Sequence, residues 1–294
     1  MNSYCLVIPV YNHHRQLLRI IDALRASELP LFIVNDGSDA DCCAALARVA
    51  AQDADKQDAD KHNPDEQDTD KKVRLINLPT NGGKGIAVVA GLRAAHREGF
   101  SHALQIDSDG QHDSVHIAEF LRAGDAHPDH FISGARPYHL LPASRRYGRR
   151  LTDFWVVINT LETRIQDSMC GYRLYPLGPT LKLVNEVDLC QRMDFDTDIA
   201  VQLLWRGVNI TNVPISVVYD ASIPSHFDLV NDNFRITAMH VRHCLACCCD
   251  CHACSGERGH DRNRNRDTGS VSRYRFDGHR LAWPLPQVSG SRAV

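Results

Sequence analysis

Short apolar runs alternate with amphipathic segments from the start of the chain, and this alternation limits the choice of fold more than any other feature. Residues 4–10 (YCLVIPV) and 31–35 (LFIVN) have the composition of buried strands. Between them, Leu17, Ile21 and Leu24 fall on one face of a helix. Because strands joined through a helix run parallel, we expect an α/β fold in which helices flank a mostly parallel central sheet.

The same alternation continues along the chain. The further elements that we expect are a helix at about 40–51, a strand at 73–78, a helix at about 84–98 with Gly99 at its C′ position, a strand at 102–107, a helix from about 114 with Ser114 as its N-cap, a strand at 131–135, a helix at about 145–164, a strand at 171–175, a helix at 197–206 and an edge strand at 209–219.

Length and charge exclude several classes of protein. A chain of 294 residues can bury a sizeable core, and its net charge of −3 is not that of a nucleic-acid-binding protein. No apolar stretch approaches the roughly 18 residues of a membrane span, and the first residues do not resemble a signal peptide. We therefore expect a cytoplasmic protein with at most peripheral contact to the inner face of the cytoplasmic membrane.

Two segments have a composition that does not suit a core. Residues 52–72 repeat a unit close to QDADK, which predicts a disordered and functionally inert insertion. Six of the eleven cysteines lie between Cys244 and Cys254, where two C-x-x-C pairs are too close for an ordinary zinc site. We expect one domain at 1–243 and a disordered tail at 244–294 whose thiols bind soft metals or oxidise adventitiously.

Residues 105–113, QIDSDGQHD, carry the strongest functional signal. An apolar run leads directly into Asp107 and Asp109, so two carboxylates follow the end of a strand. Open α/β sheets bind ligands at that edge, and Mg²⁺ is often held there by one or two carboxylates together with substrate phosphates. A polar turn with two solvated acids is the alternative.

Two earlier strands also end in polar motifs. Asp36, in NDGSDA, can accept hydrogen bonds from a base or ribose, whereas Ser38 and Asp39 can simply cap the next helix. Residues 81–85, NGGKG, offer free backbone amides at a helix start, and Lys84 adds a positive charge suited to a diphosphate. A flexible loop is the competing interpretation. Three successive strand ends therefore predict a base-reading acid, a phosphate cradle and a metal site.

These motifs resemble a known family. IPVYNHHRQL, IVNDGSDA, NGGKGIAVVAGL and ALQIDSDGQHD are similar to the successive signatures of glycosyltransferase family 2, and DSDGQH resembles its polyprenyl-phosphate (dolichyl-phosphate-mannose-like) members. DSMCGYRLYPL, RMDFDTDIAVQLLWRG and SHFDLVNDNFRITAMH resemble a bacterial subgroup associated with lipid-linked or aryl-polyene-type cell-envelope biosynthesis. The resemblance covers roughly 4–243 apart from 52–72. His13 and Asn35 depart from the usual acids of the first two motifs.

The resemblance implies a GT-A fold, the Rossmann-like fold of nucleotide-diphospho-sugar transferases, and sugar transfer with inversion. The donor is then a UDP- or GDP-sugar, the acceptor a polyprenyl phosphate or another hydrophobic molecule, and the cofactor Mg²⁺ or Mn²⁺. The metal ligands that it implies are Asp107, Asp109 and Gln111. His226 is a further candidate ligand to the metal or to the diphosphate, because imidazole can bind either, with packing as its alternative role. The residues expected to bind the nucleotide sugar are Pro9, Tyr11, Asp36, Gly83, Lys84 and Asp107.

The acceptor decides whether the reaction needs a base. A polyprenyl phosphate is already anionic, whereas a hydroxyl group would need a carboxylate nearby. Asp167 is our first candidate for this base, and Asp196 is the second unless it only caps a helix. The positive residues expected to meet an acceptor phosphate, unless they form a solvated helix face, are Arg145, Arg149 and Arg173.

Two other functions compete with this reading. A sugar nucleotidyltransferase uses a related fold, but IPVYNHH lacks the glycine-rich basic loop that such enzymes carry after the first strand. A non-catalytic, degenerate relative is the third possibility, which the insertion and the unusual tail favour. Metal-dependent binding of UDP separates an enzyme from such a relative.

Overall fold

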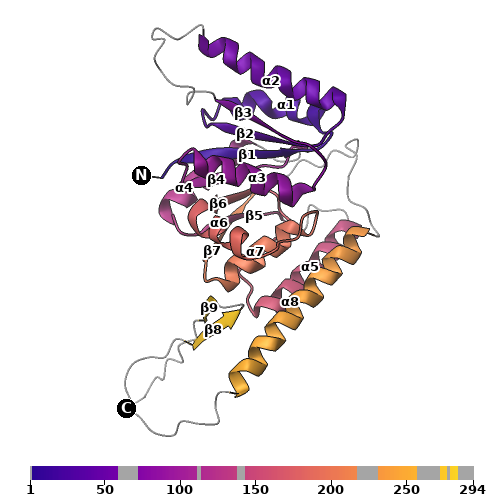
Figure 1. Ribbon diagram of the computed structural model, residues 1–294, viewed down its shortest axis with the longest axis vertical. Coiled ribbons are helices and arrows are strands. Elements are labelled where there is room, and N and C mark those ends of the chain that lie inside the picture. The colour runs from indigo at the N-terminus through magenta and orange to yellow at the C-terminus, as the bar shows by residue number, and fades with distance from the viewer. Residues whose placement is uncertain are drawn as a thin grey trace.

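A computed structural model of the protein describes residues 2–58, 72–110, 114–137, 143–216, 231–256, 272–276 and 279–283. Its centre is a seven-stranded sheet with the strand order β3-β2-β1-β4-β6-β5-β7 (Figure 1). The strands of this sheet are β1 Tyr4–Val10, β2 Leu31–Asp36, β3 Val73–Leu78, β4 His102–Gln105, β5 Phe131–Ala135, β6 Arg173–Pro176 and β7 Ile210–Pro214.

Helices cover both faces of the sheet, so the expected α/β fold with a mostly parallel sheet is confirmed. The helices are α1 His14–Arg25, α2 Ala40–Asp58, α3 Lys84–Arg97, the 3₁₀ helix η2 Ser114–His116, α4 Ile117–Ala126, α5 Ala143–Thr160, α6 Leu177–Glu186, α7 Phe195–Trp205 and α8 Asn231–Gly256. A separate hairpin pairs β8 Ser272–Phe276 with β9 His279–Trp283.

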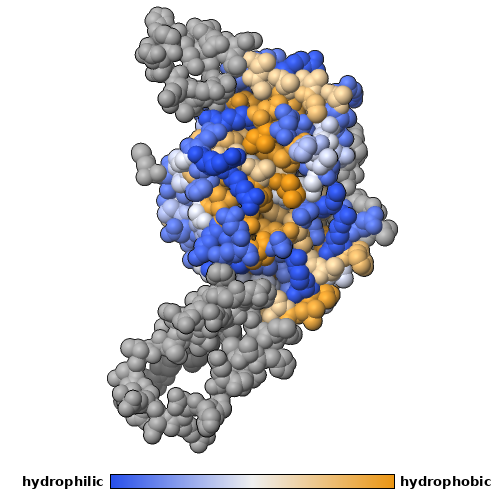
Figure 2. Space-filling model, viewed as in Figure 1, coloured by the Kyte–Doolittle hydropathy of each residue, from blue (hydrophilic) through white to orange (hydrophobic). Residues whose placement is uncertain are grey.

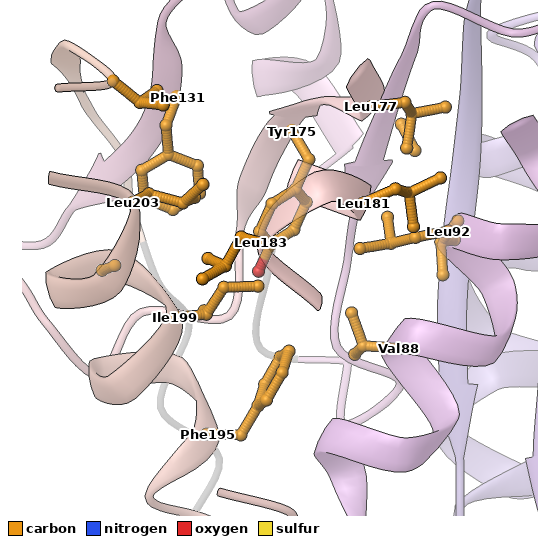
Figure 3. Close-up of a cluster of buried hydrophobic side chains, with 14 of the residues drawn as sticks. Val88, Leu92, Phe131, Tyr175, Leu177, Leu181, Leu183, Phe195, Ile199 and Leu203 are labelled. Carbon is orange, nitrogen blue, oxygen red and sulfur yellow. The ribbon is translucent and has the colours of Figure 1, made fainter. Parts of the chain in front are cut away.

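Two hydrophobic clusters, one on each face, hold the layers together. Alternate residues of β1 divide between them: Cys5 and Val7 join one cluster, whereas Leu6 and Ile8 join the other. Helices α3, α6 and α7 pack over the first face, and α1, α2 and α4 pack over the second. In Figure 3, side chains of α3, α6 and α7 meet around Tyr175, which β6 contributes to the first cluster.

Strand β6 is the exception to the parallel order, and it brings distant residues to the site. It runs antiparallel to both β4 and β5. Its register pairs Arg173 with Gln105, the last residue of β4. The CGYR segment that precedes and begins β6 therefore lies beside the Asp107 motif, although more than sixty residues separate them along the chain.

The low-complexity segment begins as a helix, which corrects our expectation that all of 52–72 lies outside the fold. Helix α2 continues to Asp58, and Asp53 is 8% exposed. Its carboxylate accepts a hydrogen bond from the amide of Val73 at 2.9 Å and lies 3.5 Å from the guanidinium of Arg25. The repeat therefore supplies one buried acceptor to the edge strand β3.

The prediction that the chain beyond residue 243 does not fold is wrong for three segments. Helix α8 extends to Gly256, and 272–276 and 279–283 form the hairpin. In α8 the buried positions Ile236, Met239 and His243 recur at helical spacing, and the small apolar cysteines do not interrupt a helix that is already formed.

Several element boundaries also differ from those expected. Helix α5 ends at Thr160, where Leu161 adopts a φ of 54°, rather than near 164. Strand β7 ends at Pro214, and the expected strand residues 217–219 lie outside the described residues. Gly99 follows the C-cap of α3 as predicted, whereas α4 is preceded by a 3₁₀ turn that begins at Ser114.

Candidate active site

The carboxylate of Asp36, at the end of β2, holds the glycine-rich loop. Its Oδ1 accepts the amide of Gly82 and its Oδ2 accepts the amide of Gly83, both at 2.8 Å. Gly83 has a φ of 98°, and a Cβ there would lie 2.5 Å from the carbonyl oxygen of Gln191. The amides that we expected to face a diphosphate are therefore directed at Asp36, which orients the loop that carries Lys84.

Lys84 begins α3 and joins two carboxylates from distant segments. Its Nζ lies 2.8 Å from Oδ2 of Asp107 and 2.6 Å from Oδ2 of Asp196. Burial alone would lower the pKa of Lys84, but the two carboxylates outweigh it and raise this pKa above its ordinary value. The side chain is therefore a charged ammonium at the carboxyl edge of the sheet.

A buried amide and phenol fix the carboxylates on the other side. Nε2 of Gln105 lies 3.2 Å from Oδ1 of Asp107 and 3.5 Å from Oδ1 of Asp196. The hydroxyl of Tyr175 donates to Oε1 of Gln105 at 2.9 Å. Burial raises the pKa of Tyr175, so the phenol stays neutral and keeps its proton to donate. This hydrogen bond directs the amide nitrogen of Gln105 toward both acids.

Arg173 does not have the position that we expected of an acceptor ligand. It is fully buried, and its guanidinium donates to the carbonyl oxygens of Cys170 and Ser168 at 2.6 Å and to that of Asp196. It also lies 3.8 Å from Oδ1 of Asp196. The antiparallel register of β6 turns this side chain into the core, where an acceptor phosphate cannot reach it, so Arg173 positions Asp196 instead.

Gly171 allows the CGYR segment to approach Asp107 closely. A Cβ at this position would lie 1.9 Å from Oδ2 and 2.2 Å from Cγ of Asp107, distances that no real Cβ tolerates. The Asp107 side chain keeps 23% of its surface exposed. The absence of a side chain at Gly171 thus leaves room for the carboxylate between the glycine backbone and Lys84.

The first motif, IPVYN, lies at the end of β1 and borders the same edge of the sheet. Pro9 lies buried in β1 and pairs in register with Val34, whereas Tyr11 is 38% exposed. The amide of Asn12 donates to Oγ of Ser38 at 3.1 Å, which ties the turn after β1 to the turn after β2. Asp39 caps α2, as one of our two alternatives stated, because its Oδ1 accepts the amide of Cys42 at 2.8 Å.

Comparison with known proteins identifies the family to which this chain belongs. The model of the family described as Glycosyl transferase family 2 matches residues 5–175, which include Asp36, Lys84 and Asp107. The chain belongs to glycosyltransferase family 2. It is a glycosyltransferase, as we expected from the resemblance.

Two curated relatives of this glycosyltransferase have names that include their acceptors. It is 24% identical to the polyprenol monophosphomannose synthase of Mycolicibacterium smegmatis, in a match that covers 72% of this chain and 76% of that protein. It is 27% identical to the UDP-N-acetylglucosamine–dolichyl-phosphate N-acetylglucosaminyltransferase of Methanococcus voltae, over 73% of this chain and 85% of that protein.

Solved structures support the GT-A fold. A crystal structure of S. aureus TarS, residues 1–349, superposes with a TM-score of 0.51 at 14% identity and covers 83% of this chain and 65% of that one. A crystal structure of a mycobacterial protein gives a TM-score of 0.53 at 14% identity over 96% of this chain and 84% of that one. The likeness at this identity concerns the fold alone.

In this glycosyltransferase, Asp167 is locked in a buried ion pair. Its carboxylate lies 2.6 Å from Nε and 2.8 Å from Nη2 of Arg136, and both residues are less than 10% exposed. Burial would raise the pKa of Asp167, but the Arg136 guanidinium outweighs it and holds this pKa below its usual range. A base that works near neutral pH needs a pKa shifted in the other direction.

Asp196 is not the helix cap that we considered as its alternative role. The N-cap of α7 is Asp194, so Asp196 lies inside the first turn with its Oδ2 on Lys84. Two residues further along, the buried Asp198 accepts from Nε2 of His243, from Arg242 and from the amide of Cys190, each at 2.7 Å. Helix α8 is thereby fastened to the helix that carries Asp196.

The donor atoms in the described part of the site are of a kind that suits a divalent cation. The oxygen atoms of Asp107 and of the half-buried Asp109 are the hard donors that Mg²⁺ and Mn²⁺ prefer. Within the described ranges no three His, Cys, Asp or Glu side chains form a complete metal cage. Gln111 and His226 lie outside these ranges, as does the side chain of Arg145, so the remaining ligands are not described.

Sequence reasoning missed three residues that organise this site. Gln105 is a polar residue in a buried strand, and a polar side chain at such a position is itself a sign of a functional role. Gly171 stands out only once the neighbouring strand is known, because its constraint is a long-range contact with Asp107. Arg136 follows β5 without any motif of its own, and only the fold pairs it with Asp167.

Proposed function

We propose that this glycosyltransferase transfers a sugar, with inversion, from a nucleotide-diphosphate donor to a lipid phosphate such as polyprenyl phosphate in cell-envelope biosynthesis. The observation that carries the proposal is the cluster in which Lys84 joins Asp107 to Asp196 at the carboxyl edge of the sheet. The names of the relatives support the acceptor class, since both name a polyprenol or dolichyl phosphate. A structure of TarS in complex with UDP-GlcNAc, which has the same fold, supports the donor class.

The donor diphosphate is expected beside Lys84. A bound Mg²⁺ or Mn²⁺, held by Asp107 and Asp109 together with Gln111 and His226, would neutralise the charge of the departing nucleotide diphosphate. Lys84 provides positive charge at the same edge, and its own two carboxylates keep it protonated. Tyr11, exposed next to the β2 turn, is proposed to contact the nucleotide, and Asp36 acts by holding the loop in place.

Both carboxylates that could serve as a base are engaged with cations, and this supports an acceptor that needs none. Asp167 is bound by Arg136, and Asp196 is bound by Lys84. A phosphate oxygen is already a nucleophile at neutral pH, so neither pair has to open for the reaction. Arg149, partly buried on α5, lies close enough to Asp167 to lower its pKa and remains the proposed contact for the acceptor phosphate.

Isothermal titration with UDP and with GDP, each with and without Mn²⁺, tests the donor site. We expect metal-dependent binding that Asp109→Ala removes while thermal unfolding is unchanged. Asp41→Ala, an exposed acid on α2, is the matched control and should bind as the wild type does. Transfer from the bound donor to a polyprenyl phosphate should then release nucleoside diphosphate.

Three results would count against the proposal. Full activity of Asp109→Ala would contradict the metal assignment. Release of pyrophosphate from UTP or GTP in the presence of a sugar 1-phosphate, without transfer from the nucleotide sugar, would indicate a nucleotidyltransferase. A folded wild-type protein that binds neither nucleotide, with or without the metal, would indicate a non-catalytic relative.

A further inference from the structure

Exposed apolar side chains are concentrated on one pair of helices. Of the twelve large hydrophobic residues that are exposed in the described ranges, eight lie on α5, just after it or on α8. Isolated exposed apolar residues are normal, but a concentration of this kind marks an interaction surface. Figure 2 shows hydrophobic side chains at the surface where these two helices lie.

Helix α5 has an outward apolar face in addition to its buried one. Leu151, Phe154, Trp155 and Ile158 follow the i, i+3, i+4, i+7 spacing of one helical face, and their exposed fractions run from 38% to 60%. Leu161, directly after the helix, is 73% exposed. The buried positions of α5 lie at Thr152, Val156 and Asn159, between the exposed ones. The exposed apolar residues therefore take little part in the packing of α5 against the rest of the protein.

Helix α8 repeats this pattern. Phe234, Val241 and Leu245 are 75%, 53% and 62% exposed and are spaced i, i+7, i+11, which places them on one face. Its buried residues Ile236 and Met239 belong to the opposite face. A helix that is apolar on two faces has one face for its own core and one for a partner.

The two helices form one surface. Figure 1 shows α5 and α8 side by side at one end of the molecule, away from the sheet. Nδ2 of Asn159 lies 2.9 Å from Nδ1 of His240, and Sγ of Cys244 donates to Oδ1 of Asn159 at 2.9 Å. The Trp155 ring stacks 6.3 Å from the His240 ring. These contacts fix the outward face of α5 next to that of α8.

The charge of this surface selects the partner. Arg150 is exposed on α5, and the side chains of Arg235 and Arg242 on α8 are 44% and 48% exposed, although each of these two also pairs with a carboxylate, Asp232 at 3.5 Å and Asp198 at 2.7 Å. Both of these carboxylates are buried, and Asp153 on α5 accepts a hydrogen bond from Ser168, so the charge that the described part of this surface exposes is positive. A second copy of the chain would bring the same arginines face to face, whereas an anionic surface complements them.

We infer that the outward face of α5 and α8 docks on the anionic surface of a lipid bilayer. Exposed Phe, Trp and Leu side chains enter the boundary between headgroups and acyl chains, and flanking arginines bind the lipid phosphates. No helix of the described residues is long and apolar enough to cross a membrane, so this contact is interfacial. The inference deepens the proposed function, on which it rests for a lipid-borne acceptor, but the contact itself does not require catalysis.

Vesicle co-sedimentation of the full chain tests the surface without any substrate. Vesicles of phosphatidylcholine mixed with phosphatidylglycerol should bind the wild type, and added salt or omission of the anionic lipid should weaken binding. The double variant Phe234→Ser with Leu245→Ser should bind these vesicles roughly tenfold more weakly, since two exposed anchors are lost. The matched control is Leu18→Ser with Val115→Ser, a pair that is also exposed but lies elsewhere.

A second readout uses Trp155, whose fluorescence should shift to the blue on binding vesicles and should not shift in Trp155→Phe. Equal vesicle binding by the wild type, the α8 double variant and the control would overturn the inference. So would a concentration-dependent dimer that the α8 double variant dissociates, combined with no vesicle binding. Vesicle binding without any sugar transfer would instead count against the proposed function alone.

Discussion

A methyl group at residue 171 should disable the site without unfolding the protein. In Gly171→Ala the new Cβ would stand 1.9 Å from Oδ2 of Asp107, about 1.5 Å closer than the 3.4 Å at which ordinary contact begins. Asp107 carries the exposed end of its side chain into the site, so it is the group that has to move. A shift of that size separates its Oδ2 from Nζ of Lys84, now 2.8 Å away, and its Oδ1 from Gln105.

The size of the effect follows from how sharply catalysis depends on position. A displacement of about 1 Å near the chemistry can cost about 10²-fold in rate, so we expect kcat/KM for sugar transfer to fall by at least that factor. Stability should fall much less, by about 1–3 kcal/mol, as in other cases of overpacking. Metal-dependent nucleotide binding, measured by titration, should weaken in parallel because Asp107 is displaced.

The control for this variant is Gly178→Ala. Gly178 is exposed in α6, and a Cβ there meets no atom within 4 Å. This change should leave activity unaltered and raise stability by about 0.5–1 kcal/mol, since alanine suits a helix better than glycine does. Wild-type turnover and nucleotide affinity in Gly171→Ala would refute the argument that the CGYR backbone sets the position of Asp107.

Two further predictions concern stability. Burial and nearby His243 lower the pKa of His240 to about 4, whereas the unfolded chain accepts this proton near pH 6.5. The free energy of unfolding should therefore fall as the pH drops from about 6.5 to about 4, by at most about 1.4 kcal/mol per pH unit from this group. Urea titrations of His240→Gln should lack this part of the pH dependence. Asp53→Ala should destabilise the fold by about 1–3 kcal/mol, because the buried amide of Val73 loses its acceptor. Deletion of 60–71 should leave both the urea midpoint and sugar transfer unchanged. Equal stability of Asp53→Ala and the wild type would show that the α2 extension contributes nothing to the stability of the fold.

The fold could be predicted to the extent that it depends on local periodicity. Strands β1 to β4 and helices α1 and α3 carry clear apolar patterns, and their parallel order follows from the helices that join them. The reversed direction of β6 could not be predicted this way, because a four-residue strand carries no signal of its direction. The continuation of α8 through the cysteines could not be predicted from composition, because a cysteine-rich segment carries no helical signal of its own.

The site could be predicted as a set of strand ends but not as a network. Asp36, Lys84 and Asp107 follow successive strands, and the structure does link them through the loop amides and the ammonium. That the glycine amides bind Asp36, and that Arg173 faces inward, depends on side-chain directions set by packing across the sheet. Those directions are long-range properties, and no local motif in the sequence encodes them.

The buried core of the site is already electrically neutral. Lys84 and Arg173 balance Asp107 and Asp196, all four within one hydrogen-bonded group. A diphosphate that arrives by itself therefore adds negative charge to a group whose positive charges are already paired, and a cation that arrives by itself must compete with Lys84 for Asp107. For the proposed metal-bound donor, each component should therefore bind weakly when alone and more strongly when the other is present.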